Sequence, residues 1–287
     1  MKTRADARAV VVLFLAACAS AATSNTSGVT TPPVTPPSWT LVWSDEFDGA
    51  AGISFDRTKW VADTGGGGWG NQEREFYTTR LDNISLDGNG HLVITALAEP
   101  ANTVDSCWYG SCRYTSARIK TAGLFSQSYG RFEARIRIPR GQGLWPAFWM
   151  LGNNIDLVGW PKSGEIDIME NIGKEPAVVH GTMHGPGYSG AGGIGGPYQL
   201  GSGVFADDFH VYAVEWNPNS VQWFVDSAQY FQTTLGSIPS GTTWVFDHPF
   251  FLLMNVAVGG GWPGDPDATT TFPQTMVVDY VRVYKKL

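Results

Sequence analysis

The sequence has few charged residues and no sustained helical periodicity. Only 16% of its 287 residues are charged, while 13% are aromatic, and an average soluble domain has about 25% charged residues. Disordered chains show the opposite pattern, and coiled coils need abundant Ala, Glu, Lys and Leu, so both classes are excluded. The net charge of −7 argues against a nucleic-acid partner, because phosphate binding needs a basic face.

Long hydrophobic runs are also absent. A basic start precedes an apolar run that ends at Ala17 and is too short to span a bilayer, which predicts a signal peptide over residues 1–17. Residues 15–18 read Leu-Ala-Ala-Cys, which resembles a bacterial lipobox in which Cys18 is lipidated. Cleavage after Ala21 is the alternative. Both predict an exported protein, an outer-surface lipoprotein or a secreted one, that contacts a membrane only through such a lipid.

The next segment, residues 18–38, is uncharged and rich in Thr, Pro and Ser, as in a tether. A single domain is predicted over residues 39–287, and we expect a monomer. In that domain Cys107 and Cys112 are the only cysteines, and two nearby cysteines in an exported protein usually form a disulfide. Two free thiols or a metal site are the alternatives, and the lack of a second cysteine pair disfavours the metal.

Apolar and polar residues alternate with a period of two in most of the domain, which is typical of half-buried strands. Two apolar runs flank residues 217–220, which read Asn-Pro-Asn-Ser and predict a hairpin. Many antiparallel strands with one apolar face each predict an all-β sandwich of two sheets. The predicted strands cover 91–96, 130–138, 211–216, 221–226, 250–258 and 276–284.

Three carboxylates gather in the apolar segment 163–171. Glu165 and Asp167 share one face of a strand, because side chains alternate. In a regular strand Glu170 would point into the core, where a lone ionised carboxylate is costly. A bulge of one residue at Ile168-Met169 would return Glu170 to the face of the other two acids.

Retaining cleavage of a glycosidic bond needs two carboxyl groups about 5–5.5 Å apart, one as nucleophile and one as acid/base. Asp167, between the two glutamates, would raise the pKa of a neighbouring Glu by repulsion. An exposed acidic strand or a calcium site are the alternatives, but here the acids alternate with Ile and Met rather than with Lys or Thr. Calcium, moreover, favours acids on a flexible loop.

The segment Glu165-Ile166-Asp167-Ile168-Met169-Glu170 resembles the signature of family 16 of the glycoside hydrolases, and its two-residue spacing before the second Glu resembles the laminarinase branch. Further segments match that branch in order, at 43–48, 69–73, 129–133, 144–151 and 278–284. The resemblance implies a jelly-roll β-sandwich with a long substrate cleft on its concave face.

The resemblance also implies roles for the three acids: Glu165 as nucleophile, Glu170 as acid/base and Asp167 as the assisting carboxylate. The implied activity is a retaining endo-β-1,3-glucanase that also accepts mixed β-1,3-1,4-glucans, with no catalytic cofactor. A hydrolase of galactan or xyloglucan on the same fold, and a glucan-binding protein without catalysis, are the rival functions. Loss of a catalytic Glu would mark the second rival, and all three acids are present.

Flat aromatic rings and hydrogen-bonding side chains suit a polysaccharide, which presents C–H faces and hydroxyl edges. The tryptophans near the acids or in Gly/Pro-rich loops are therefore predicted to bind substrate, with His184 beside Glu170; the alternative for the tryptophans is a place in the core. The resemblance also implies that Asn71 and Arg131 contact sugar hydroxyls. For Arg131 the alternative is an ordinary charge on the outer face of a strand. The candidate substrate-binding residues are Asn71, Arg131, Trp145, Trp149, Trp160, His184 and Trp262.

The sequence offers two candidate metal sites. His180 and His184 are four apart in a segment that favours a strand, where their side chains stand about 13 Å apart, so a shared metal is rejected. Relatives in the family often hold a structural calcium on the convex side. The resemblance places Glu46, through its backbone, and the Asp279 carboxylate at that site, and a hard cation suits oxygen ligands.

Overall fold

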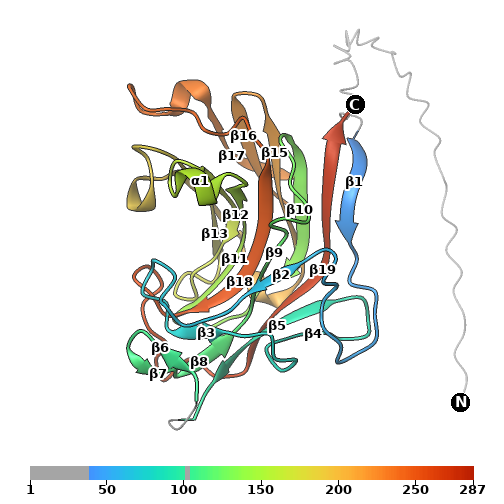
Figure 1. Ribbon diagram of the computed structural model, residues 1–287, viewed down its shortest axis with the longest axis vertical. Helices are drawn as coiled ribbons and strands as arrows, with labels where there is room; N and C mark the ends of the chain where they lie inside the picture. The colour runs from blue at the N-terminus through green and yellow to red at the C-terminus, as the bar shows by residue number, and fades with distance from the viewer. Residues whose placement is uncertain (1–38, 101–103) are drawn as a thin grey trace, which may run out of the picture. The chain divides into compact units, whose positions relative to one another are not determined.

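The computed structural model describes residues 39–100 and 104–287. The predicted signal peptide, Cys18 and most of the tether therefore lie outside the described residues. The described part is a sandwich of two large sheets, as predicted, with very little helix (Figure 1). None of the helices in this part is long and apolar enough to cross a membrane.

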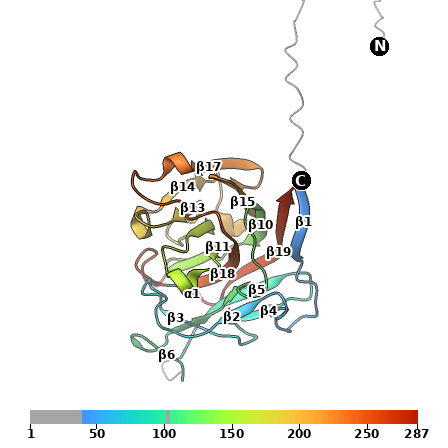
Figure 2. The same cartoon turned by 45° about the horizontal axis from the view of Figure 1, so that its top comes forward.

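One sheet has ten strands, in the order β17-β16-β15-β10-β19-β5-β8-β3, with β1 also paired to β19 and β4 to β5. All its pairs are antiparallel except β3 with β8. Figure 2 shows β1 beside β19, the last strand of the chain. The strands are β1 Trp39–Asp45, β3 Glu75–Tyr77, β4 Ile84–Leu86, β5 Leu92–Ala98, β8 Tyr114–Ser116, β10 Gly130–Arg137, β15 His210–Asn217, β16 Ser220–Val225, β17 Ala228–Thr234 and β19 Gln274–Lys286.

The other sheet has seven strands, in the order β14-β13-β12-β11-β18-β9-β2, and carries the acidic segment at its centre. Its strands are β2 Val61–Asp63, β9 Arg118–Lys120, β11 Leu144–Gly152, β12 Glu165–Glu170, β13 Val178–His184, β14 Ile194–Gln199 and β18 Phe250–Val258. A separate small hairpin pairs β6 (Ser106–Cys107) with β7 (Gly110–Ser111). The helical turns are α1 Ile155–Val158 and three 3-10 turns, Gly190–Gly192, Phe205–Asp207 and Leu235–Ser237.

The core lies between the two sheets. In β5 every second side chain is buried, as the alternation predicted, and in β10 Phe132, Ala134 and Ile136 are buried in the same way, together with Glu133 on the other face. Leu92 and Phe132 are completely enclosed. Each such side chain contributes about 1.5–3 kcal/mol of hydrophobic stabilisation. Strand β18 is buried at all nine positions. One of its faces packs in the core, and on the other face Phe251 and Leu253 pack with Leu151 in a small second apolar cluster.

The predicted strands are confirmed, with ends shifted by a few residues. The predicted hairpin joins β15 to β16, and Asn217 pairs with Ser220. Its turn residue Asn219 has a φ of 63°, a left-handed conformation that Asn tolerates better than most residues.

Candidate active site

The three acids share one face because β12 contains a bulge. Strand β11 pairs with Asp167 and then with Met169, so Ile168 has no partner there. On the β13 side the register also shifts between Asp167 and Glu170. The predicted bulge at Ile168–Met169 is therefore confirmed, and it brings Glu170 to the same side as Glu165 and Asp167.

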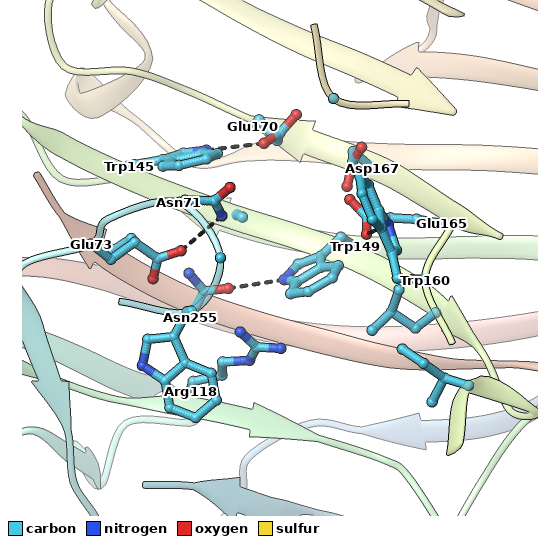
Figure 3. Close-up of a pocket in the computed structure, with 17 residues that line it drawn as sticks. Asn71, Glu73, Arg118, Trp145, Trp149, Trp160, Glu165, Asp167, Glu170 and Asn255 are labelled. Atoms are coloured by element: carbon cyan, nitrogen blue, oxygen red, sulfur yellow. Dashed lines mark hydrogen bonds between the residues drawn. The ribbon is translucent and has the colours of Figure 1, made fainter. Parts of the chain in front are cut away.

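A cleft of about 520 Å³ lies on this face of the seven-stranded sheet, and all three acids line it (Figure 3). This volume is within the range of roughly 300–1,000 Å³ that is common for ligand sites. Strands β11, β12, β18 and β9 supply most of the lining, and the loop before β3 supplies one wall. Besides the acids, the larger lining side chains are Trp69, Asn71, Glu73, Arg118, Trp145, Trp149, Trp160 and Asn255.

Two indole N–H groups orient the two glutamates. Trp145 donates a hydrogen bond from Nε1 to Glu170 Oε1 at 3.0 Å, drawn as a dashed line in Figure 3. Trp160 donates from Nε1 to Glu165 Oε2 at 2.9 Å. Both tryptophans line the cleft, as predicted, and each fixes one oxygen of a carboxylate while leaving the second oxygen for chemistry.

His184 adds a basic group to the acids. Its Nε2 lies 3.1 Å from Asp167 Oδ2 and 3.9 Å from Glu165 Oε1. One oxygen of each carboxylate and one ring nitrogen lie within 4.8 Å of one another. His184 is therefore beside Glu165 and Asp167 rather than beside Glu170, because its Cα pairs with that of Glu165 across β12 and β13.

The electrostatics of the acids keep protons in the site at neutral pH. Burial, and then repulsion from Asp167, raises the pKa of Glu165 to about 8. Burial raises the pKa of Asp167 to about 7. Burial, with repulsion from both other acids, raises the pKa of Glu170 well above its usual value. Three close carboxylates do not all ionise together, so one of them is available as a proton donor.

A chain of hydrogen bonds supports the wall opposite the acids. Glu73 accepts hydrogen bonds from Asn71 Nδ2 and from Tyr77 Oη, both at 3.0 Å. Tyr77 Oη accepts from Asn255 Nδ2 at 3.1 Å, and Asn255 Oδ1 accepts from Trp149 Nε1 at 2.9 Å. The predicted cleft residues Asn71 and Trp149 are thus held through three residues that sequence reasoning missed. The segment Trp-Gly-Asn-Gln-Glu at 69–73 predicts only Asn71 as a cleft residue, although Glu73 belongs to the same motif.

The cation of the cleft is Arg118, which sequence reasoning also missed. Its guanidinium lies over the rings of Trp69 and Trp149, with its central carbon 4.9 Å and 4.8 Å from their centroids. Asp63, 3.0 Å from Arg118 Nε, supplies the counter-charge. Arg118 follows a buried stretch and is the first residue of β9, and no local pattern distinguishes it from other strand arginines.

The prediction that Arg131 binds substrate is wrong. Arg131 lies on β10 of the ten-stranded sheet and is not among the residues that line the cleft. Its neighbour Phe132 points into the core, so Arg131 points outward on the opposite side of the sandwich. There it forms ion pairs with Glu133 at 2.7 Å and with Glu215 at 3.0 Å.

Trp262 lies beside the cleft rather than in its lining. Its ring packs edge-on against Trp145 and His180, with centroid distances of 5.4 and 5.1 Å. Its loop is joined to the cleft wall, since Gly261 N donates to the Asn71 carbonyl at 2.9 Å.

The two histidines of β13 lie apart. His180 pairs with Glu170 at one end of β12, and His184 pairs with Glu165 at the other.

The structure joins Cys107 and Cys112 in a disulfide, as predicted. The enclosed Trp108 donates from Nε1 to the Glu73 carbonyl at 2.8 Å, and Tyr109 Oη donates to the Arg74 carbonyl at 2.5 Å. The small hairpin of β6 and β7 therefore supports the backbone of the cleft wall at Glu73 and Arg74.

The side chains of the two residues of the predicted calcium site are held in ion pairs. The carboxylate of Asp279 accepts from Arg135 at 2.6 Å. The side chain of Glu46, expected to contribute only its backbone, is paired with Arg282 at 2.7 Å. A cation at Asp279 would have to compete with the guanidinium beside it, so no calcium is assigned here.

Sequence comparison relates the chain to one known family. The model of "Glycosyl hydrolases family 16" matches residues 72–282. The chain belongs to this family. A "Beta-glucanase" from Rhodothermus marinus is 46% identical over 260 residues, which are 87% of this chain and 86% of that protein.

Solved structures of the family agree in fold. The laminarinase catalytic domain of Thermotoga maritima is 49% identical, with a TM-score of 0.80 over 87% of this chain and 99% of that one. The endo-β-1,3-glucanase of Pyrococcus furiosus is 48% identical, with a TM-score of 0.81 over 88% and 96%. This family 16 member is thus a glycoside hydrolase with a jelly-roll fold, as the sequence motifs predicted, and its family needs no catalytic cofactor.

Proposed function

We propose that this glycoside hydrolase cleaves internal bonds of β-1,3-glucans with retention of configuration. The observation that carries the proposal is the bulged strand, which presents Glu165, Asp167 and Glu170 together in a cleft lined by tryptophans. Indole rings suit the C–H faces of sugar rings, and the Asn71 and Asn255 amides suit their hydroxyls. The laminarinases and endo-β-1,3-glucanases among the similar proteins support the same substrate class.

In the first step Glu165, in its ionised form, attacks the anomeric carbon as the bond to the leaving oxygen breaks, and Glu170, in its protonated form, gives that oxygen its proton. The products are a glycosyl-enzyme ester and a shortened glucan. In the second step Glu170 takes a proton from water, the water oxygen bonds to the anomeric carbon, and Glu165 leaves as a carboxylate. The raised pKa of Glu170 suits a group that starts as an acid.

Asp167 and His184 act on the ionisation of Glu165 in opposite directions. Asp167 is almost completely buried, and its negative charge disfavours ionisation of the nearby glutamates. His184, when protonated, compensates that charge and lowers the pKa of both Glu165 and Glu170. The pair therefore adjusts how the site divides its protons between nucleophile and acid.

The test measures reducing-sugar release from laminarin and from barley mixed-linkage glucan. Glu165→Gln and Glu170→Gln are expected to lose at least about a thousandfold in kcat while keeping the wild-type Tm or a higher one. Proton NMR of the first product should show the β-anomer, as retention requires. An initial α-anomer, or a fully active Glu165→Gln variant, would contradict the mechanism. Lack of release from either glucan by folded wild type would refute the substrate class.

We further propose that the protein is exported and carries a lipid on Cys18. The disulfide supports export, since disulfides persist in oxidising compartments. A polymeric substrate is also met outside the cell. Expression in a bacterium with radiolabelled palmitate should label the wild type and not Cys18→Ala. Label retained by the variant would refute lipidation at this residue, and a cytoplasmic location of both would refute export.

A further inference from the structure

A second pocket, of about 430 Å³, opens beside the catalytic cleft. One of its walls is the segment 122–126, which follows β9. Another wall contains Asn153 and the first residues of α1, the short helix that Figure 1 shows near β12. Ile155, on α1, lines both this pocket and the cleft. The two hollows are therefore neighbours that share one side chain as their divider.

The register of the sheet places this pocket close to the nucleophile. Leu151 on β11 pairs with Glu165 on one side and with Phe251 on the other. Phe251, which is almost completely buried, lines the pocket. Adjacent strands are about 4.8 Å apart, so the Phe251 and Glu165 backbones are separated by roughly 10 Å.

Strand β9 indicates on which side of the acids the pocket lies. Arg118 and Lys120 are two residues apart, so they face the same side of the sheet. Arg118 lines the cleft and Lys120 lines the pocket. The pocket therefore lies next to the part of the cleft formed by β18 and β9, away from β13 and His184.

The lining of the pocket has the mixed character of a sugar site. Donors and acceptors for hydroxyl groups come from Ser126, Asn153 and Asp156, and from Lys120, whose ammonium also lies 2.6 Å from the Asp63 carboxylate. Phe251, Ile155 and the exposed Leu124 offer apolar contact for C–H faces. A hollow with apolar surface and a few polar groups is a common form of small-ligand site.

We propose that this pocket binds a single glucosyl side group of a β-1,3-glucan whose backbone occupies the main cleft. The inference rests on the proposed function. The cleft already provides a path for the backbone past the acids, Trp149 and Arg118. The second pocket opens to the side of that path, beyond Ile155, where a substituent on a backbone sugar would enter. The protein would then favour side-branched glucans over linear ones.

The test fills the pocket from both walls. Ser126→Trp and Asn153→Trp place an indole in it from exposed positions on two different segments. Leu157→Trp is the matched control, because Leu157 is 88% exposed on the same helix and lines neither hollow. kcat/KM is measured on a linear β-1,3-glucan and on one carrying single 6-linked glucosyl groups, and Tm confirms that each variant is folded.

Each filled variant should lose about tenfold in kcat/KM on the branched glucan, the scale on which one pocket discriminates. On the linear glucan it should stay within about twofold of wild type, and Leu157→Trp should match wild type on both. An equal loss on both glucans, or no loss on either, would overturn the proposal. Wild-type activity on the linear glucan reports on the proposed function separately, so failure of that function is recognised independently of the pocket.

Discussion

The hydroxyl of Tyr77 connects two parts of the cleft wall, and its removal should weaken both folding and substrate binding. Tyr77 is completely buried, donates to Glu73 at 3.0 Å and accepts from Asn255 at 3.1 Å. Tyr77→Phe keeps the ring and deletes only the oxygen. Glu73 would retain its bond from Asn71, whereas the Asn255 amide N–H would lose a partner in a buried place.

The size of the effect follows from those partners. A buried polar group left without its hydrogen bond costs about 1–3 kcal/mol, and two groups are affected here, so we expect a loss of about 3 kcal/mol in unfolding free energy. In a domain of this size that lowers Tm by roughly 6–12 °C. Because Asn255 also holds Trp149, KM for laminarin should rise severalfold with a smaller change in kcat.

The assay pairs urea unfolding with steady-state kinetics, and Tyr212→Phe is the control. Tyr212 is also completely buried, but its hydroxyl has no hydrogen-bond partner within the described part of the chain. Its removal should leave stability unchanged or slightly higher, because it relieves a buried unsatisfied oxygen. The reasoning is refuted if the two variants lose similar stability, or if Tyr77→Phe loses less than about 0.5 kcal/mol, below the range expected for one such group.

Three further predictions concern charge and covalent support. Burial raises the pKa of Glu165 from 4.5 to about 8, so the stability of the protein falls as pH rises through that interval. Glu165→Gln should therefore raise Tm at pH 8 and change it little at pH 4. Equal shifts of Tm at the two pH values, measured by calorimetry, would contradict this. Arg131→Met should lower the unfolding free energy by about 1–3 kcal/mol, measured in urea, yet leave KM within twofold; a large rise in KM would restore its place at the substrate. Replacing Cys107 and Cys112 with Ala should lower the unfolding free energy by about 2 kcal/mol through the lost loop closure, and it should raise KM. Kinetics identical to wild type would show that the hairpin does not support the cleft wall.

The comparison of Arg131 with Arg118 shows where sequence reasoning stops. Both are strand arginines next to buried residues, and the sequence does not say which face of which sheet each occupies. Arg131 lies outside, between two glutamates, and Arg118 lies in the cleft between two indoles. The difference is decided by the order of strands in the two sheets, which is a long-range property.

Local chemistry alone was enough for the acids. The spacing of Glu165, Asp167 and Glu170 admitted one regular strand with a buried charge or one bulged strand with three acids on a face, and the cost of burying a lone charge selected the bulge. The alternation of apolar residues likewise predicted the sandwich and its main strands, because strands with one apolar face each bury those faces between two sheets.

Only the tertiary structure decided which residues distant in the sequence contact one another. Glu73 and Tyr77 are joined to Asn255, which is far away in the sequence, through hydrogen bonds that no local pattern encodes. Burial and mutual proximity, not residue type, raise the pKa values of the three acids. The sequence by itself determined which groups could perform the chemistry, because their spacing on one strand is local. The structure decided their environment, because distances across sheets depend on how the whole chain folds.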